Sequence, residues 1–294
     1  MKDYQFKMYL RSRGALVNGY LQTRLGVGSI SPVDKAMAYS VAAGGKRLRP
    51  ILLMAAADAV GGDGPKYVSV AAGLEMIHTY SLIHDDLPCM DNDDYRRGKL
   101  TNHKMFGDAM ALLAGDGLLT QAFEVMLEQR DVEPKRLLQV VQLVAQCAGP
   151  VGMVGGQALD ITSEDKVLTE KEMRQLHEAK TGALFVAAIR GGALLGGADA
   201  TLLQDMTRFA KLFGLAFQIT DDILDVTGDE KIMGKPAHTD EKLKKSTYVS
   251  LFGLEKAQEI AKDTLEKAEA ILAPYGENAE PLVEITRYLY NRKK

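Results

Sequence analysis

Cysteine is scarce in this sequence, and the shortage bears on both the fold and the compartment. Only two cysteines, Cys89 and Cys147, occur among 294 residues. Two cysteines do not make a disulfide framework, and so few of them fit a reducing compartment. We therefore expect a cytoplasmic protein whose fold rests on a hydrophobic core, for which a hydrophobic content of 46% is sufficient.

Long apolar runs and a large excess of one charge are also missing. No uninterrupted apolar run reaches the roughly 18 residues of a membrane-spanning helix, and the N-terminal MKDYQFKMYLRSRG lacks the apolar core of a secretory signal. The net charge of −3 argues against a general nucleic-acid partner. These absences leave an enzyme or a binding protein with no membrane span and no nucleic acid.

Strand signals are weak, whereas helical patterns are frequent. Segments such as MTRFAKLFGLAFQITDDILD and LEKAQEIAKDTLEKAEAIL carry apolar residues at three- and four-residue spacing. They predict an all-α fold of about ten helices, with Ser31 and Thr169 as N-caps of two of them. No linker is long enough to separate domains, so we expect one domain over 1–294. Breaks are expected near 29–32, 61–65, 131–134, 149–152, 163–169, 196–199, 228–240 and 274–281.

Two helical segments end in paired aspartates, and the second is the simpler case. Asp221, Asp222 and Asp225 form the pattern DDxxD. At 100° per residue, Asp221 and Asp225 lie about 40° apart around a helix, so the three carboxylates share one side. Like charges at this spacing repel, and a divalent cation with oxygen ligands would remove the repulsion. A solvated acidic helix end is the alternative.

The first cluster, in YSLIHDDLPCMDNDDYRRGK, has the longer spacing DDxxxxD through Asp85, Asp86 and Asp91. On a straight helix Asp91 would lie about 240° from Asp85, well off its face. The intervening Pro88 disfavours helical geometry, so we expect a local bulge that absorbs two residues. Such a bulge restores the arrangement of DDxxD. A solvated acidic end again remains possible, but two such clusters are harder to dismiss together.

Basic residues follow or flank each acidic cluster. In GGKRLRP, glycines allow a close approach of the backbone to an anion, and Lys46, Arg47 and Arg49 supply phosphate-binding groups, although a plain surface loop is the alternative. Arg96 and Arg97 come directly after the first acids. Further along are Lys180 and Thr181 in AKTGAL, and Lys235 and Lys245 after the second acids. Cations beside acids are typical of metal-bridged anions with more phosphate to neutralise. His78 lies two turns before Asp85, and is either a phosphate-site residue or an ordinary core histidine.

Taken together, GGKRLRP, IHTYSLIHDDLPCMDNDDYRRGKLTNHK, AKTGAL, FQITDDILD and KKSTYV resemble the trans-isoprenyl diphosphate synthases. The resemblance runs from about residue 25 to the end and is strongest to the bacterial farnesyl diphosphate synthases, followed by the geranylgeranyl enzymes. It implies an all-α isoprenoid synthase bundle around a deep cavity, one polyprenyl synthetase domain, a homodimer, and Mg²⁺, three ions per active site. Tyr95 and Leu100 depart from the family pattern and put only loop packing in doubt.

The resemblance also implies roles for individual residues. Metal binding falls to Asp85, Asp86, Asp91, Asp221, Asp222 and Asp225. Isopentenyl diphosphate binding falls to Gly45, Lys46, Arg49, His78 and Arg97. Binding of the allylic diphosphate (dimethylallyl or geranyl diphosphate) falls to Arg96, Lys180, Thr181, Gln218, Lys235 and Lys245, and among these Lys180, Thr181, Gln218 and Lys235 are expected to act in catalysis.

The implied reaction is ionisation of the allylic diphosphate, attack by the double bond of isopentenyl diphosphate, and loss of a proton. Tyr80 and Ser81 stand at the positions where the family places the bulk that limits product length, which favours a C15 product, although Tyr80 could also be ordinary core. A geranylgeranyl diphosphate synthase and a non-catalytic synthase subunit are the alternatives. A terpene cyclase fits less well because it needs no second diphosphate pocket.

Overall fold

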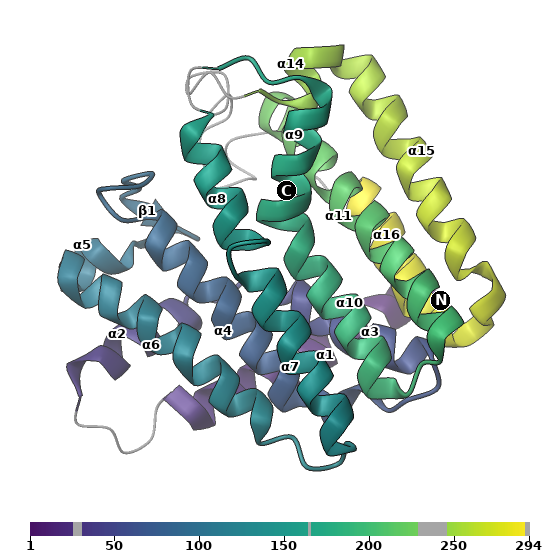
Figure 1. Cartoon of the computed structure of the whole chain (residues 1–294), viewed down its shortest axis with the longest axis horizontal. Coiled ribbons are helices and arrows are strands. Elements are labelled where there is room, and N and C mark those ends of the chain that lie inside the picture. Colours follow the sequence, from purple (N-terminus) through teal and green to yellow (C-terminus); the bar gives the residue numbers. More distant parts are fainter. Residues whose placement is uncertain (26–30, 164–165, 229–245, 292–294) are drawn as a thin grey trace. The chain divides into compact units, whose positions relative to one another are not determined.

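The computed structural model describes residues 1–25, 31–163, 166–228 and 246–291 (Figure 1). The all-α prediction is confirmed, since the described residues form helices and one two-stranded hairpin. The chain folds as two compact units, one of residues 2–54 and 63–141 and the other of residues 1, 55–62 and 142–294. The expectation of a single domain stays a prediction. We describe each unit by itself.

The first unit is built around the buried helix α4. Its elements are α1 (Asp3–Leu25), α2 (Pro32–Ala42), the start of α3 (Leu48–Ala59), η1 (Gly64–Tyr67), α4 (Val68–Asp85), β1 (Tyr95–Arg96), β2 (Lys99–Leu100), α5 (Asn102–Phe106), α6 (Asp108–Leu127) and the start of α7 (Pro134–Ala148). Twelve of the eighteen residues of α4 are buried, as expected for a helix that is apolar on all sides. α4 packs mainly on α6 (Figure 1). Gly73 permits this close approach, because a Cβ there would lie 2.6 Å from Met126 Cγ.

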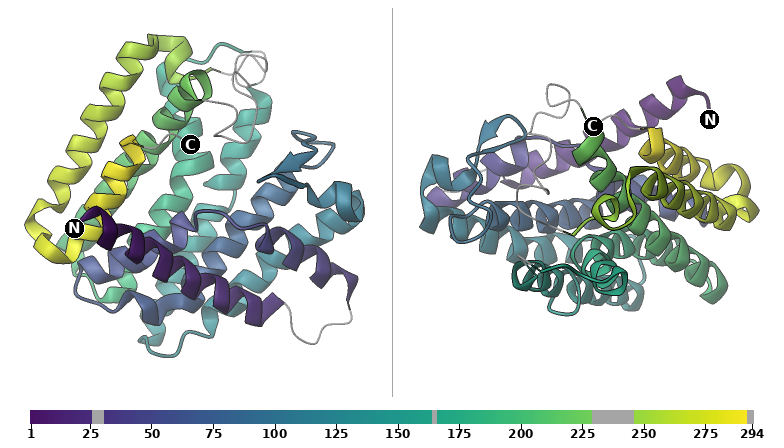
Figure 2. Two further views of the ribbon diagram at one scale, coloured as in Figure 1. Left: turned by 180° about the vertical axis from the view of Figure 1, so that it is seen from behind. Right: turned by 90° about the horizontal axis from the view of Figure 1, so that it is seen from above.

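The second unit is built around the long helix α11. Its elements are α8 (Met153–Thr162), α9 (Glu170–His177), the π-helical turn η2 (Glu178–Gly182), α10 (Ala183–Gly196), α11 (Ala200–Thr227), α14 (Tyr248–Phe252), α15 (Leu254–Leu272), η3 (Ala273–Ala279) and α16 (Glu280–Asn291), with the ends of α3 and α7. α11 packs along α15 and α10, and the α11–α15 pair can be followed in both views of Figure 2. Phe185 of α10 meets Phe213 of α11 edge to face, with ring centroids 5.2 Å apart.

The predicted helix starts are largely confirmed. Thr169 caps α9 in a capping box, in which its side chain accepts from the Glu172 N–H and the Glu172 side chain accepts from the Thr169 N–H. Ser31 is the N-cap residue of α2 with Pro32 next to it, but its side chain makes no capping hydrogen bond. The expected breaks did not include the loop 43–47, although Gly44 and Gly45 are helix breakers, and the helix end at the first paired aspartates is followed by the loop 86–94.

Two stretches of the described chain are long and apolar enough for a membrane span by length and mean hydropathy, Asp108–Leu127 and Pro134–Thr162. They were not expected because an uninterrupted apolar run was sought, whereas mean hydropathy tolerates isolated charges such as Asp116. Length and hydropathy are weak grounds for a span, since a core helix meets the same criterion. The second stretch is also broken by the turn at 149–152.

Candidate active site

The first acidic cluster lies where α4 ends, and it contains the expected two-residue bulge. The Asp91 N–H donates to the Asp85 carbonyl oxygen at 2.9 Å. This acceptor would receive the N–H four residues later in a continuing α-helix, so two extra residues are looped out. Asn92 then leaves the turn with φ of 53°, a left-handed conformation that asparagine tolerates well. The bulge returns Asp91 to the end of α4 that carries Asp85.

Asp86 is held by Arg96 rather than turned to solvent. It is 3% exposed, and Nε and Nη2 of Arg96 lie 2.7 and 2.6 Å from its Oδ1. Burial raises the pKa of the Asp86 carboxyl, and the bond and charge of Arg96 oppose that effect. The pair therefore fixes the orientation of the Arg96 guanidinium and neutralises a buried charge.

Arg97 points away from Arg96 because the two residues sit at the corner of a hairpin. β1 and β2 are antiparallel with Arg96 opposite Lys99, and the two-residue loop Arg97–Gly98 has φ of 54° and 72°. Positive φ at both positions defines a type I′ turn, which normally favours Asn or Gly at the first position. A positive φ costs conformational free energy for an arginine, so this conformation persists only where the surrounding contacts hold it. Tyr95 and Leu100, the two departures from the family pattern, are cross-strand partners in this hairpin.

The Arg97 guanidinium lies on the glycine loop. It donates to the Gly44 carbonyl oxygen, and a Cβ on Gly45 would lie only 2.7 Å from Arg97 Cζ. Burial lowers the pKa of Arg97. Lys46 is exposed and Arg49 is half-buried at the start of α3, where helix N–H groups also favour an anion.

His78 faces the same cations from α4. Burial and then the charges of Arg49, Arg97, Arg96 and Arg47 hold the pKa of His78 well below its usual 6.5. Its imidazole is therefore neutral at physiological pH. The structure thus brings Arg49, His78 and Arg97, which were predicted from separate motifs, into one electrostatic environment.

The two candidate length-determining residues lie on α4 before the acids. Tyr80 is 6% exposed and packs edge to face on His84, with ring centroids 5.6 Å apart. Ser81 donates its hydroxyl to the His78 carbonyl oxygen of its own helix at 2.9 Å. His84 Nε2 lies 3.0 Å from the Leu112 carbonyl oxygen, and Gly115 leaves room for the imidazole ring, because a Cβ there would overlap the ring in this position.

The second acidic cluster occupies the last turns of α11 in the other unit. Asp222 and Asp225 are 3% and 5% exposed, and Asp221 is half-buried. Both oxygens of Asp222 accept hydrogen bonds, Oδ1 from Gln218 Nε2 at 3.1 Å and Oδ2 from the Tyr248 N–H at 2.8 Å. The Tyr248 bond ties the start of α14 to the acidic end of α11.

Lys180 and Thr181 lie in the π-helical turn η2. Glycines on both neighbouring helices make room for this turn. A Cβ on Gly156 of α8 would overlap the Lys180 backbone nitrogen, and one on Gly214 of α11 would lie 3.1 Å from Gly182 Cα. Single π-helical turns are frequent at functional sites. Here the turn packs on α8, which carries Asp160, and on α11, which carries the second acidic cluster.

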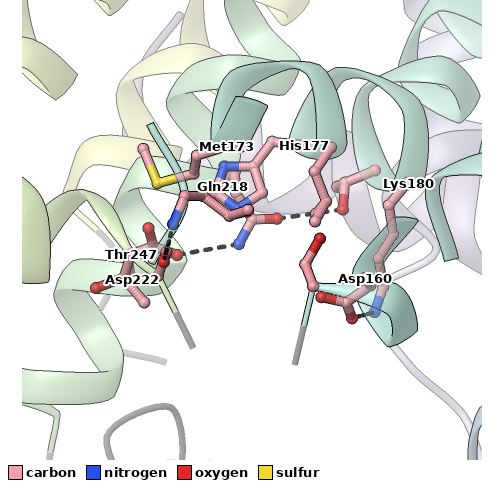
Figure 3. A pocket seen from close by; sticks show the side chains of 12 residues that line it. Asp160, Met173, His177, Lys180, Gln218, Asp222 and Thr247 are labelled. Atoms are coloured by element: carbon pink, nitrogen blue, oxygen red, sulfur yellow. Dashed lines mark hydrogen bonds and ion pairs between the residues drawn. The ribbon is translucent and has the colours of Figure 1, made fainter. Parts of the chain in front are cut away.

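Figure 3 shows the pocket beside this turn, and polar contacts cross it in two groups. Lys180 Nζ lies 2.5 Å from Asp160 Oδ2. Thr181 Oγ1 donates to Gln218 Oε1 at 3.1 Å, and the Gln218 amide in turn donates to Asp222. The second group links the predicted catalytic oxygens to a predicted metal ligand.

Sequence reasoning missed two residues of this pocket. Asp160 follows a glycine-rich segment, and only the contact with Lys180 gives it significance. His177 is 9% exposed, burial lowers its pKa to about 4, and its Nδ1 has no hydrogen-bond partner within the described residues. The helical spacing of His177 and Lys180, three residues apart, was the available signal. Lys235 and Lys245, predicted for the allylic site, lie outside the described residues.

The acidic side chains suit Mg²⁺ by chemistry, although no group of three or more His, Cys, Asp or Glu in the described residues forms a ready metal cluster. Mg²⁺ prefers oxygen ligands and takes one or two carboxylates together with waters and substrate phosphates. Asp85 with Asp91, and the aspartates at the end of α11, meet that need without a preformed cage. The residues therefore fit the ion.

Carboxylates at helix ends, with guanidinium and ammonium groups nearby, suit an anion bridged by a metal ion. The polyprenyl synthetase family model matches residues 31–279. The chain is 52% identical over 229 residues to the farnesyl diphosphate synthase of Geobacillus stearothermophilus, covering 77% of each. It is 42% identical over 294 residues to the chloroplastic geranylgeranyl pyrophosphate synthase of Capsicum annuum, covering 99% of this chain and 80% of that one.

A solved structure agrees with these relatives. The FPP/GFPP synthase of Zymomonas mobilis, in its apo form, superposes with a TM-score of 0.89 at 37% identity, covering 97% of this chain and 99% of that one. The chain belongs to the polyprenyl synthetase family. It is a prenyltransferase of the trans-isoprenyl diphosphate synthase type.

Proposed function

We propose that this chain is a Mg²⁺-dependent farnesyl diphosphate synthase. It condenses isopentenyl diphosphate head to tail (1′-4) with dimethylallyl diphosphate and then with geranyl diphosphate, and it releases diphosphate at each step. The observation that carries the proposal is that a fixed cation accompanies the acids in each unit. Arg96 is bonded to Asp86 in the first unit, and Lys180 is bonded to Asp160 in the second, in the turn whose Thr181 is linked through Gln218 to Asp222. The Geobacillus relative supports the farnesyl product.

The basic residues of the glycine loop and Arg97 are proposed to bind isopentenyl diphosphate without a metal ion. Gly45, Lys46, Arg49 and Arg97 would hold its phosphate oxygens, because guanidinium forks and an open glycine backbone match this geometry. A neutral His78 donates or accepts one hydrogen bond without adding charge. Isopentenyl diphosphate carries no leaving group in this reaction, so binding alone is required of these residues.

Allylic diphosphate is proposed to bind Arg96, Lys180, Lys235 and Lys245. The six aspartates of the two clusters would hold Mg²⁺, which when bound neutralises the diphosphate and makes it a better leaving group. Asp86 orients Arg96, and Asp160 orients Lys180. Each cation is therefore fixed before substrate arrives, which lowers the reorganisation needed during ionisation.

The allylic cation is stabilised by oxygen dipoles beside it, and a base must accept the proton that is lost after condensation. Thr181 and Gln218 supply the dipoles, and the Gln218 amide is oriented by its bond to Asp222. Among the residues that the structure describes we identify no side-chain base suited to the final proton, so the departing diphosphate is the proposed acceptor. This assignment follows from the family resemblance and from the negative charge of the diphosphate, which is the most highly charged anion that the reaction releases.

A geranylgeranyl diphosphate synthase is the second candidate, and the Capsicum relative favours it. The test is to incubate the purified protein with Mg²⁺, isopentenyl diphosphate and dimethylallyl diphosphate and to chromatograph the dephosphorylated products. Farnesol is expected as the main product. Geranylgeraniol as the main product would replace the farnesyl assignment, and a lack of condensation would favour a non-catalytic subunit.

We also propose a homodimer. Leu112, Leu113 and Leu127 of α6 are 47%, 52% and 52% exposed, and such an apolar helix face suits burial against a second copy. Size-exclusion chromatography with light scattering tests it, and a monomer at micromolar concentration would contradict it. The cytoplasmic location stays a prediction.

A further inference from the structure

Arg47 belongs to the basic motif GGKRLRP, but its side chain is directed into the protein. It is only 4% exposed, whereas the neighbouring Lys46 is exposed. Three of its nitrogen atoms are already committed. Nη1 lies 2.8 Å from Glu75 Oε1, Nη2 donates to the Val41 carbonyl oxygen at 2.6 Å, and Nε donates to Asn18 Oδ1 at 2.8 Å. Arg47 is therefore not a phosphate ligand.

These contacts connect the glycine loop to three helices of its unit. Asn18 comes from α1, Val41 from the end of α2 and Glu75 from the middle of α4. Glu75 is 1% exposed and lies one helical turn before His78. The ion pair thus links the loop to the part of α4 that carries a proposed ligand of isopentenyl diphosphate.

The loop has a backbone conformation that local sequence does not favour. Gly44, Gly45 and Arg47 have φ of 86°, 126° and 49°. A positive φ is natural for the glycines and unfavourable for Arg47, so other contacts must hold Arg47 in place. Its three hydrogen bonds are the contacts that do so.

A contribution to the free energy of unfolding does not explain the Arg47–Glu75 ion pair well. Attraction between buried charges is largely offset by the loss of their hydration, and apolar replacements of similar volume are often tolerated. A role in placing neighbouring groups explains it better, because Lys46 and Arg49 directly flank Arg47. Small displacements of such groups have large effects on binding and rate.

We propose that Arg47 and Glu75 are positioning residues, which hold the loop 43–49 so that Lys46 and Arg49 receive isopentenyl diphosphate. This inference rests on the proposed function. Neither residue touches the substrate. Their loss should therefore weaken isopentenyl diphosphate selectively and leave the allylic site unchanged.

The test uses the full chain with both charges replaced, Arg47→Met with Glu75→Leu, so that no buried charge is left alone. We expect a melting temperature close to that of the wild type and a KM for isopentenyl diphosphate raised about tenfold or more, with the KM for geranyl diphosphate within about twofold. Arg24→Gln with Glu128→Gln removes a half-exposed ion pair of the same unit as a matched control. The control should leave both Michaelis constants unchanged.

A folded double variant with an unchanged KM for isopentenyl diphosphate would overturn the proposal, and so would equal increases for both substrates. If the double variant does not fold, Arg47→Lys replaces it. Lysine keeps a charge beside Glu75 but cannot reach all three acceptors, so the same selective increase is expected, and its absence in a folded protein would overturn the proposal. Arg49→Ala in the same assay separates a failure of the proposed isopentenyl diphosphate site from a failure of the positioning role of Arg47 and Glu75. If Arg49→Ala leaves this KM unchanged, the proposed isopentenyl diphosphate site itself is wrong.

Discussion

Arg96 and Arg97 are neighbours in the chain, yet their guanidinium groups contact different partners. The type I′ turn directs Arg96 to Asp86 and Arg97 to the glycine loop. Adjacent arginines therefore serve different diphosphates in our proposal. The family resemblance implied this separation, and the hairpin supplies a physical reason for it.

We predict that Arg97→Ala raises the KM for isopentenyl diphosphate and that Arg96→Ala raises the KM for the allylic substrate. Loss of a charge-assisted contact to phosphate should raise the affected KM roughly ten- to a hundredfold. Steady-state kinetics with each substrate varied in turn measures the effect. Arg96→Ala should also lower the melting temperature, since it leaves the buried Asp86 carboxylate without this partner. Equal effects of both variants on both substrates would contradict the assignment.

His177 gives a pH-dependent prediction. Its pKa is about 4 in the folded chain against 6.5 for an ordinary histidine, so the unfolded chain binds more protons between these values. The contribution of His177 to stability therefore falls as pH is lowered from 6.5 toward 4, by at most on the order of 3 kcal/mol. Urea unfolding of the wild type and His177→Leu at several pH values tests this. The wild type should lose stability relative to the variant in that range, and a constant difference would count against it.

At the scale of elements, the π-helical turn η2 depends on glycine in the helix opposite. We predict that Gly156→Ala forces α8 and η2 apart, because its Cβ would overlap the Lys180 backbone nitrogen. Overpacking of this kind costs roughly 1–3 kcal/mol, and kcat should fall because Lys180 moves away from Asp160. Gly19→Ala in α1, with nothing within 4 Å of its Cβ, is the control and should if anything stabilise the protein. Unchanged kcat in Gly156→Ala would show that the turn is not required.

Helix α4 carries both the first acids and the proposed limit on product length. Tyr80 lies about 7.5 Å along the helix axis from Asp85. We predict that Tyr80→Ala yields C20 or longer products while turnover is retained. If Tyr80 is only core, truncation instead costs roughly 3–5 kcal/mol of stability and leaves the product at C15. Mass spectrometry of the products, together with a melting curve, distinguishes these outcomes.

The elements also show what sequence could and could not predict. The bulge at Pro88 and the N-cap at Thr169 follow from local chemistry, and both were predicted correctly. The π-helical turn was not predicted, because it depends on Gly156 and Gly214, which are distant in sequence. Likewise, GGKRLRP does not reveal which arginine is buried. Only the acceptors supplied by α1, α2 and α4 decide that.

At the scale of the whole molecule, each compact unit carries one acidic cluster with its own cations. The first unit holds Asp85 and Asp91, and the second holds Asp221 and Asp225. Neither cluster forms a closed metal cage within the described residues. In our proposal each cluster binds Mg²⁺ together with substrate phosphate, because Mg²⁺ in proteins usually takes one or two carboxylates alongside substrate phosphates and waters.

The most direct test is the turnover of Asp85→Ala and Asp221→Ala over a Mg²⁺ titration, with wild type and Asp263→Ala alongside. Asp263 is an exposed aspartate paired with Lys267 and serves as the matched control. We predict that both cluster variants lose activity by orders of magnitude while their circular dichroism and melting curves persist. We also predict that wild type and control need Mg²⁺. Full activity of the wild type in EDTA, or wild-type turnover in either folded cluster variant, would contradict the central claim.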